Sequence, residues 1–148
     1  MTARVDAAAQ FGDDGSLTLW ASRPALVDLG HALDSKVNAV IELTHTVPIP
    51  PYLAAADQIR VRVDAEPGLT ISREDDQVVV TGHPSALAIL ARNISRLGSD
   101  PAALGSHIHI EYFADHFYLR SDSIPVVVEA TDGDGPTPGS PRRADAAA

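Results

Sequence analysis

The chain has 148 residues, carries a formal net charge of −9 at pH 7 and contains no cysteine. The acidic balance disfavours binding to nucleic acid or to an anionic membrane, because both need basic surface. The lack of cysteine excludes disulfides, thiol nucleophiles and zinc–thiolate sites. The N-terminus has no apolar leader and no apolar run approaches about 18 residues, so we expect a cytoplasmic protein without a membrane span.

The first half of the chain predicts two strands, a helix and two further strands. Ser22 has the character of a helix N-cap, Pro24 suits the first turn, and leucines follow at helical spacing. Three prolines between Thr46 and Pro51 predict a loop. The predicted strands of this half are residues 1–12, Leu17–Ala21, Ala39–Thr44 and Ile59–Ala65.

The second half predicts the same order of elements. Its helix begins at Pro84 and is expected to end near Gly98. The tail, residues 133–148, has no apolar pattern and is predicted to be disordered. The predicted strands are Leu69–Arg73, Gln77–Thr81, His107–Phe113 and Ile124–Ala130.

The two halves also match in register. At an offset of 61 positions, Leu17 falls on Val78 and Leu29 falls on Leu90. We therefore predict an α+β fold, a tandem β-β-α-β-β duplication that forms one largely antiparallel sheet with two helices on one face. It is expected to be a single domain over residues 1–132, with pseudo-repeats at about 4–66 and 68–131. The predicted core face of the sheet is Leu17, Leu19, Ile41, Leu43, Val61, Val63, Val78, Val80, Ile110, Tyr112, Val126 and Val128.

The opposite face of the predicted sheet carries the candidate binding residues Trp20, Glu42, Arg60, Arg62 and Phe113. Aromatic side chains mixed with arginine and carboxylate are typical of recognition surfaces. A solvated sheet face with scattered aromatic residues is the competing interpretation.

His107, His109 and Glu111 alternate along one predicted strand, which would place neighbouring side chains about 6.5–7 Å apart. The two histidines could hold a metal together with His116 or Glu111, although no third ligand is fixed by spacing. Alternatively, His109 and Glu111 could perform acid–base chemistry, or the histidines could be ordinary polar residues. No phosphate-binding loop or nucleophile elbow is present, and no cofactor is predicted.

Three segments resemble a known family: Gly82-His83-Pro84-Ser85-Ala86-Leu87, His107-Ile108-His109-Ile110-Glu111, and Ser123-Ile124-Pro125-Val126-Val127-Val128. Together they are similar to the bacterial immunity protein 32 family, in which a helix with small residues and leucines precedes a His-rich strand and a Val-rich closing strand. The resemblance covers only the second half. It implies a cytoplasmic protein that neutralises a toxin by binding it, and the acidic charge would suit a basic, nuclease-like toxin.

The leading hypothesis is a non-enzymatic protein-binding domain that uses the open sheet face, with His109 contributing beside the five binding residues. The alternative is a small biosynthetic enzyme, of isomerase or cyclase type, acting on an apolar small molecule. Its pocket would lie between the sheet face and the Pro48–Pro51 loop, with His109 as acid–base, assisted by Glu111 and His107. Arg60 or Arg62 would hold an anionic group of the substrate. A homodimer that buries both sheet faces is the third possibility.

Overall fold

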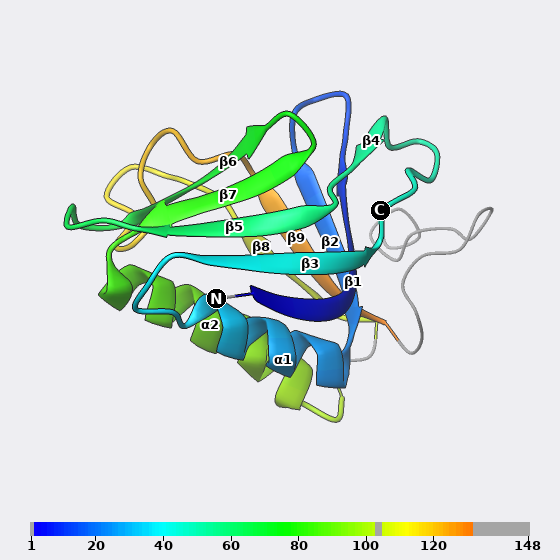
Figure 1. Cartoon of the computed structure of the whole chain (residues 1–148), viewed down its shortest axis with the longest axis horizontal. Helices are drawn as coiled ribbons and strands as arrows, with labels where there is room; N and C mark the ends of the chain where they lie inside the picture. Colours follow the sequence, from blue (N-terminus) through cyan, green and yellow to red (C-terminus); the bar gives the residue numbers. More distant parts are fainter. Residues whose placement is uncertain (1, 103–104, 132–148) are drawn as a thin grey trace.

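A large curled sheet and two helices make up the protein, seen here in a computed structural model that describes residues 2–102 and 105–131 (Figure 1). The predicted disordered tail, residues 133–148, lies outside the described residues. The helices are α1 (Arg23–Leu33) and α2 (Pro84–Ser99). The strands are β1 (Thr2–Phe11), β2 (Leu17–Ser22), β3 (Ala39–His45), β4 (Ala54–Ala55), β5 (Gln58–Val63), β6 (Leu69–Glu74), β7 (Gln77–Gly82), β8 (His107–Ile110) and β9 (Val126–Thr131).

The sheet is mixed, so the prediction of a largely antiparallel sheet is wrong. Its strand order is β6-β7-β5-β3-β1-β2-β9-β8, with β4 paired beside β1. Short connections give the antiparallel pairs β1–β2 and β6–β7, and β8–β9 is antiparallel across the longer connection of residues 111–125. Three pairs are parallel, namely β1–β3, β2–β9 and β5–β7. Strands in these pairs are separated by a helix or by a longer stretch of chain, which parallel pairing requires.

Both halves contribute two strands, a helix and further strands in the same chain order. The hairpin β1–β2 has a counterpart in β6–β7, and β3–β5 has one in β8–β9. This order does not test whether the halves superpose, so the internal duplication stays a prediction. The pairs β2–β9 and β5–β7 each join one half to the other, which makes the two halves parts of one sheet.

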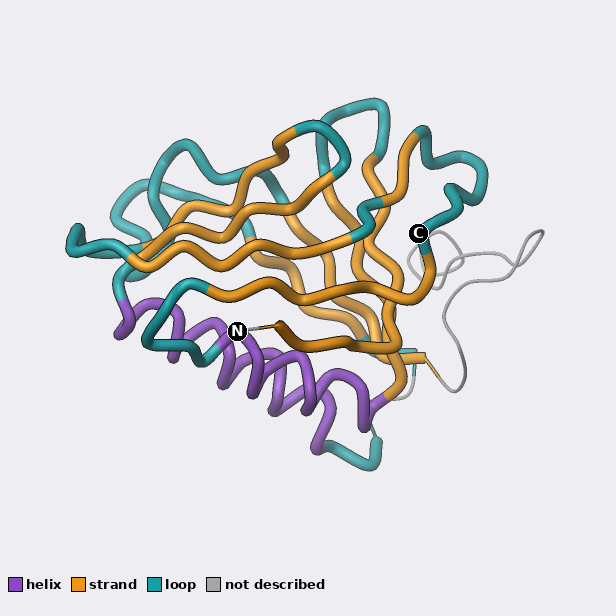
Figure 2. Tube along the Cα trace, in the orientation of Figure 1, coloured by secondary structure: helices purple, strands orange, loops and turns teal. Residues whose placement is uncertain are grey.

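The two helices lie side by side on one side of the sheet (Figure 2). Ser22 is the N-cap of α1, as predicted, and its hydroxyl accepts a hydrogen bond from the backbone N–H of Ala25 at 3.3 Å. His83 caps α2, with Nδ1 accepting from the backbone N–H of Ser85 at 3.1 Å. The position of His83 next to the predicted helix start at Pro84 already favoured a turn or cap role for it, and the structure confirms the cap.

Glycines let the helices approach closely. A Cβ atom at Gly30 would lie 2.8 Å from the backbone oxygen of Ala91, and one at Gly98 would lie 2.6 Å from the backbone oxygen of Arg23. α2 ends at Ser99, which confirms the predicted end near Gly98. Gly98 itself lies in the last turn and allows the close contact with the start of α1.

Leucine, isoleucine and valine fill the space between the helices and the sheet, as predicted. Leu26, Leu29, Leu87 and Leu90 from the helices pack against the buried strand residues. Two predicted core residues differ: Val63 is partly buried, and Tyr112 is exposed because β8 ends before it. A small apolar cavity of about 30 Å³ lies in this core. It is close to the size of one water molecule, far too small for a metabolite.

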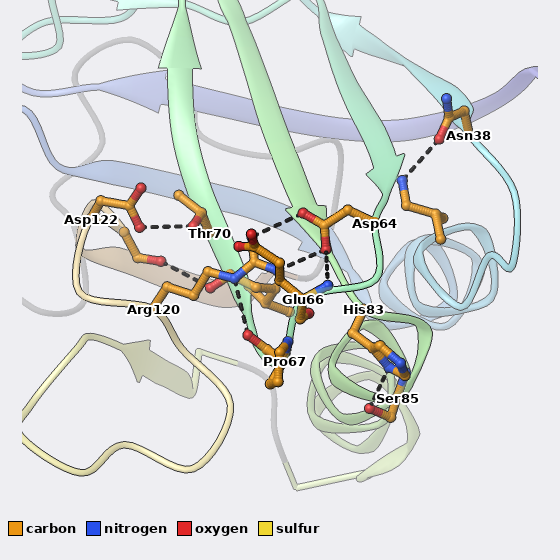
Figure 3. Close-up of polar contacts among 12 residues, drawn as sticks. Asn38, Asp64, Glu66, Pro67, Thr70, His83, Ser85, Arg120 and Asp122 are labelled. Carbon is orange, nitrogen blue, oxygen red and sulfur yellow. Dashed lines mark hydrogen bonds and ion pairs between the residues drawn. The ribbon is translucent and has the colours of Figure 1, made fainter.

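The chain between β8 and β9 runs along β6, which lies at the opposite end of the strand order from β8. Backbone hydrogen bonds join Leu69 to Tyr118 at 2.8 Å, Arg120 to Leu69 at 2.8 Å and Ile124 to Ile71 at 2.9 Å. The Arg120 guanidinium reaches Asp64 through both Nη1 and Nη2, at 3.2 and 2.8 Å (Figure 3). This hydrogen bonding lowers the pKa of the Asp64 carboxyl below its ordinary value.

Candidate functional site

Trp20 does not lie on an open surface, which corrects the exposure expected from the sequence. Its side chain is only 2% exposed. The Tyr52 ring meets the indole edge-to-face at a centroid separation of 5.0 Å, and the Tyr52 hydroxyl donates to Thr18 Oγ1 at 3.4 Å. The proline-containing loop therefore covers this part of the sheet, and Trp20 is inaccessible to a partner in this conformation.

The side-chain amide of Gln10 fastens the same loop. Its Nε2 donates to the backbone oxygen of Val47 at 3.0 Å, and its Oε1 accepts from the backbone N–H of Ile49 at 2.8 Å. Gln10 is fully buried, and its side chain satisfies backbone groups that would otherwise lack partners. The loop is hydrogen-bonded directly to the sheet. The pocket between loop and sheet that the enzyme hypothesis requires is therefore not formed at this place.

Glu42, Arg60 and Arg62 do lie on neighbouring strands, β3 and β5. Val40 pairs with Arg60 and Glu42 pairs with Gln58 across these strands. Arg62 Nη1 donates to Glu74 Oε2 at 2.9 Å, in an exposed ion pair. An open groove of about 260 Å³ lies at this place, lined by Thr2, Asn38, Ala39, Val40, Arg60, Val61 and Arg62.

The histidine pair lies elsewhere, on β8. The rings of His107 and His109 are 5.0 Å apart between centroids, at an interplanar angle of 78°. β8 ends at Ile110, whereas the sequence predicted a strand as far as Phe113. Glu111 therefore lies beyond the strand, and the predicted row of His107, His109 and Glu111 is cut short.

The structure separates the predicted site residues into two groups. In the strand order, β9, β2, β1 and β3 lie between β8 with its histidines and β5 with its arginines. Neither the groove at β3 and β5 nor the interior cavity is lined by His107 or His109. An acid–base pair assisted by Arg60 or Arg62 within one pocket is therefore not supported by the geometry.

Within residues 2–102 and 105–131, no group of three histidine, aspartate or glutamate side chains is arranged to hold a metal ion. His116, considered as a third ligand, has a structural role. Its Nδ1 accepts hydrogen bonds from the backbone N–H groups of Tyr118 at 3.2 Å and Leu119 at 3.0 Å. This nitrogen is therefore occupied.

The segment from Glu111 to Phe117, which follows β8 in the chain and is here called the aromatic loop, exposes large apolar side chains. Phe113 is 62% exposed and Phe117 is 77% exposed, and Tyr112 is also exposed. His116 organises these rings: its centroid lies 4.7 Å from that of Phe113 and 5.6 Å from that of Phe117, which it stacks upon. The aromatic loop thus presents large apolar side chains in a defined arrangement.

Of the residues in this loop, only Phe113 was predicted from the sequence to be a binding residue. The missed signal was clustering: the chain has three phenylalanines and three tyrosines, and Tyr112, Phe113, Phe117 and Tyr118 fall within one short segment. The carboxylates of Glu111 and Asp115 are exposed beside them. Apolar rings flanked by acidic groups form a surface that suits a partner with apolar and basic groups.

Residues 77–131 match the family model of immunity protein 32. The match agrees with the resemblance found in the sequence and covers the second half, including β7, α2, β8, the aromatic loop and β9. Comparison with curated proteins gives no match, and comparison with solved structures gives none. In the described part of the chain, no helix is long and apolar enough to cross a membrane.

Proposed function

We propose that this protein neutralises a protein toxin by binding to it, without catalysis, and that the aromatic loop is the centre of the contact. The observation that carries the proposal is the position of this loop inside residues 77–131, the stretch that matches the immunity protein 32 family. Phe113 and Phe117 supply large apolar rings, which commonly act as anchors in protein interfaces.

The internal order of the aromatic loop supports binding by a prearranged surface. The imidazole of His116 accepts two backbone hydrogen bonds and contacts the rings on either side. Side chains that are already ordered lose less conformational entropy on association, which strengthens binding. A loop held in this way can present Phe113 and Phe117 with little rearrangement.

Charge supports a basic partner. The chain carries a net charge of −9, and Glu111 and Asp115 lie beside the exposed rings. Opposite charges around an apolar centre accelerate association and favour the correct partner over others. We therefore infer that the toxin surface combines an apolar pocket with lysine or arginine at its rim.

The test is neutralisation of a toxin encoded beside the gene for this chain, with affinity measured by calorimetry. The double variant Phe113→Ala, Phe117→Ala should weaken binding by about 100-fold or more, since aromatic anchors commonly contribute 2 kcal/mol or more. Val47→Ala with Leu53→Ala is the matched control, because these side chains are also exposed (72% and 68%) but lie on the proline-containing loop. Undiminished affinity in the aromatic-loop variant would contradict the proposal.

A further inference from the structure

Arg60 differs from the arginines that form ion pairs with carboxylates. Its side chain is half-buried, and its Nε is buried and has no hydrogen-bond partner. Arg62 and Arg120, by contrast, each donate to a carboxylate. Glu42, on the neighbouring strand, forms no ion pair with Arg60 in the described part of the chain. Because a guanidinium is always charged, leaving its Nε–H shielded from water without an acceptor is unfavourable.

The residue that carries this unmatched donor lines the groove at β3 and β5. Arg60 and Arg62 both line it, with the polar side chains of Asn38 and Thr2 beside them. Its volume of about 260 Å³ leaves room for a small group to enter. At the rim, Arg62 already engages a carboxylate through two nitrogens, at 2.9 and 3.5 Å from the oxygens of Glu74.

We propose that this groove binds an oxyanion, a carboxylate or a phosphate group, with Arg60 as its principal contact. The guanidinium fork matches two oxygens of such a group, and charged hydrogen bonds of this kind are among the strongest in proteins. The anion would accept from Nη of Arg60 and, once the side chain turns toward the groove, from its Nε, while Arg62 and Asn38 border it. This site lies on strands outside residues 77–131, so it does not depend on the proposed toxin contact.

The experiment is an NMR titration of the whole chain with sodium acetate and, separately, with inorganic phosphate. Ionic strength is held constant with sodium chloride so that general screening does not change. The Nε–Hε signal of Arg60 and the backbone amides of residues 38–40 and 60–62 should shift saturably. Tighter binding of acetate would identify a carboxylate ligand, and tighter binding of phosphate a phosphorylated one.

Arg60→Gln should weaken the binding about tenfold or more, because it removes the charge and the fork. Arg60→Lys keeps the charge without the guanidinium fork, so its affinity for the anion should lie between those of the original protein and Arg60→Gln. This variant also tests the proposal if Arg60→Gln folds poorly. Arg92→Gln, at an exposed position of α2, is the matched control and should bind like the unmodified chain. No saturable shift with either anion up to roughly 20 mM, or equal shifts in Arg60→Gln, would overturn the proposal.

Discussion

Gly30 offers a sharp test of the helix packing, through the substitution Gly30→Ala. An added Cβ would lie 1.9 Å from Ser95 Oγ and 2.8 Å from the backbone oxygen of Ala91. The serine hydroxyl can rotate away, but the backbone oxygen can move only if α2 shifts. Overpacking of this kind costs about 1–3 kcal/mol, and the better helix propensity of alanine offsets up to about 1 kcal/mol.

We therefore expect Gly30→Ala to lower the free energy of unfolding by about 1–2 kcal/mol, which corresponds to a fall in Tm of about 4–8 °C. Urea unfolding followed by circular dichroism should show a lower midpoint with an unchanged slope. Adding Ser95→Ala removes the hydroxyl contact but not the contact with Ala91, so it should recover only part of the loss. Asp28→Ala, on the exposed side of α1, should change stability by less than about 0.5 kcal/mol. A Gly30→Ala protein as stable as the original would refute the close approach of the helices.

Three further predictions concern residues that fasten loops. Arg120→Gln should lower the free energy of unfolding by about 1.5–3 kcal/mol at neutral pH. Because the pKa of Asp64 is lowered in the folded protein, this contribution is complete above the ordinary pKa of 3.8 and disappears as the pH falls through the lower folded pKa. The urea midpoints of the variant and the original protein should therefore converge in acid. Tyr52→Ala should uncover Trp20, the only tryptophan, and shift its fluorescence to longer wavelength at a cost of about 1–2 kcal/mol; unchanged emission would mean that Tyr52 does not shield the indole. His116→Ala should weaken toxin binding about tenfold because it loosens the ordered loop, and it should also lower the Tm because the backbone N–H groups of Tyr118 and Leu119 lose their acceptor; full affinity would show that this ordering is unimportant.

The sequence predicted local structure more successfully than pairing. Both helices follow from apolar spacing, and Ser22 was recognisable as a cap because its hydroxyl needs only the adjacent turn. The parallel pairs β2–β9 and β5–β7 depend on contacts between strands far apart in the chain, which periodicity does not specify. The burial of Trp20 escaped prediction for the same reason, since Tyr52 belongs to a distant loop.

The candidate site was predictable only in part. Alternation placed Glu42, Arg60 and Arg62 on one face correctly, because they lie within well-formed strands. It failed at Glu111 and Phe113, where the strand ends earlier than the apolar pattern suggested. The pairing of Arg62 with Glu74 joins β5 to β6, and no local pattern indicates a contact of this kind.

The mixed sheet has a consequence for experiments on fragments. Two strands that bound the family-matched stretch, β7 and β9, form hydrogen bonds with β5 and β2, which lie outside it. Excising residues 77–131 would expose both strand edges, and such edges promote aggregation. An isolated peptide of residues 77–131 therefore does not represent the intact chain. Binding studies need the first half as well, because its strands pair with β7 and β9 and so support the aromatic loop.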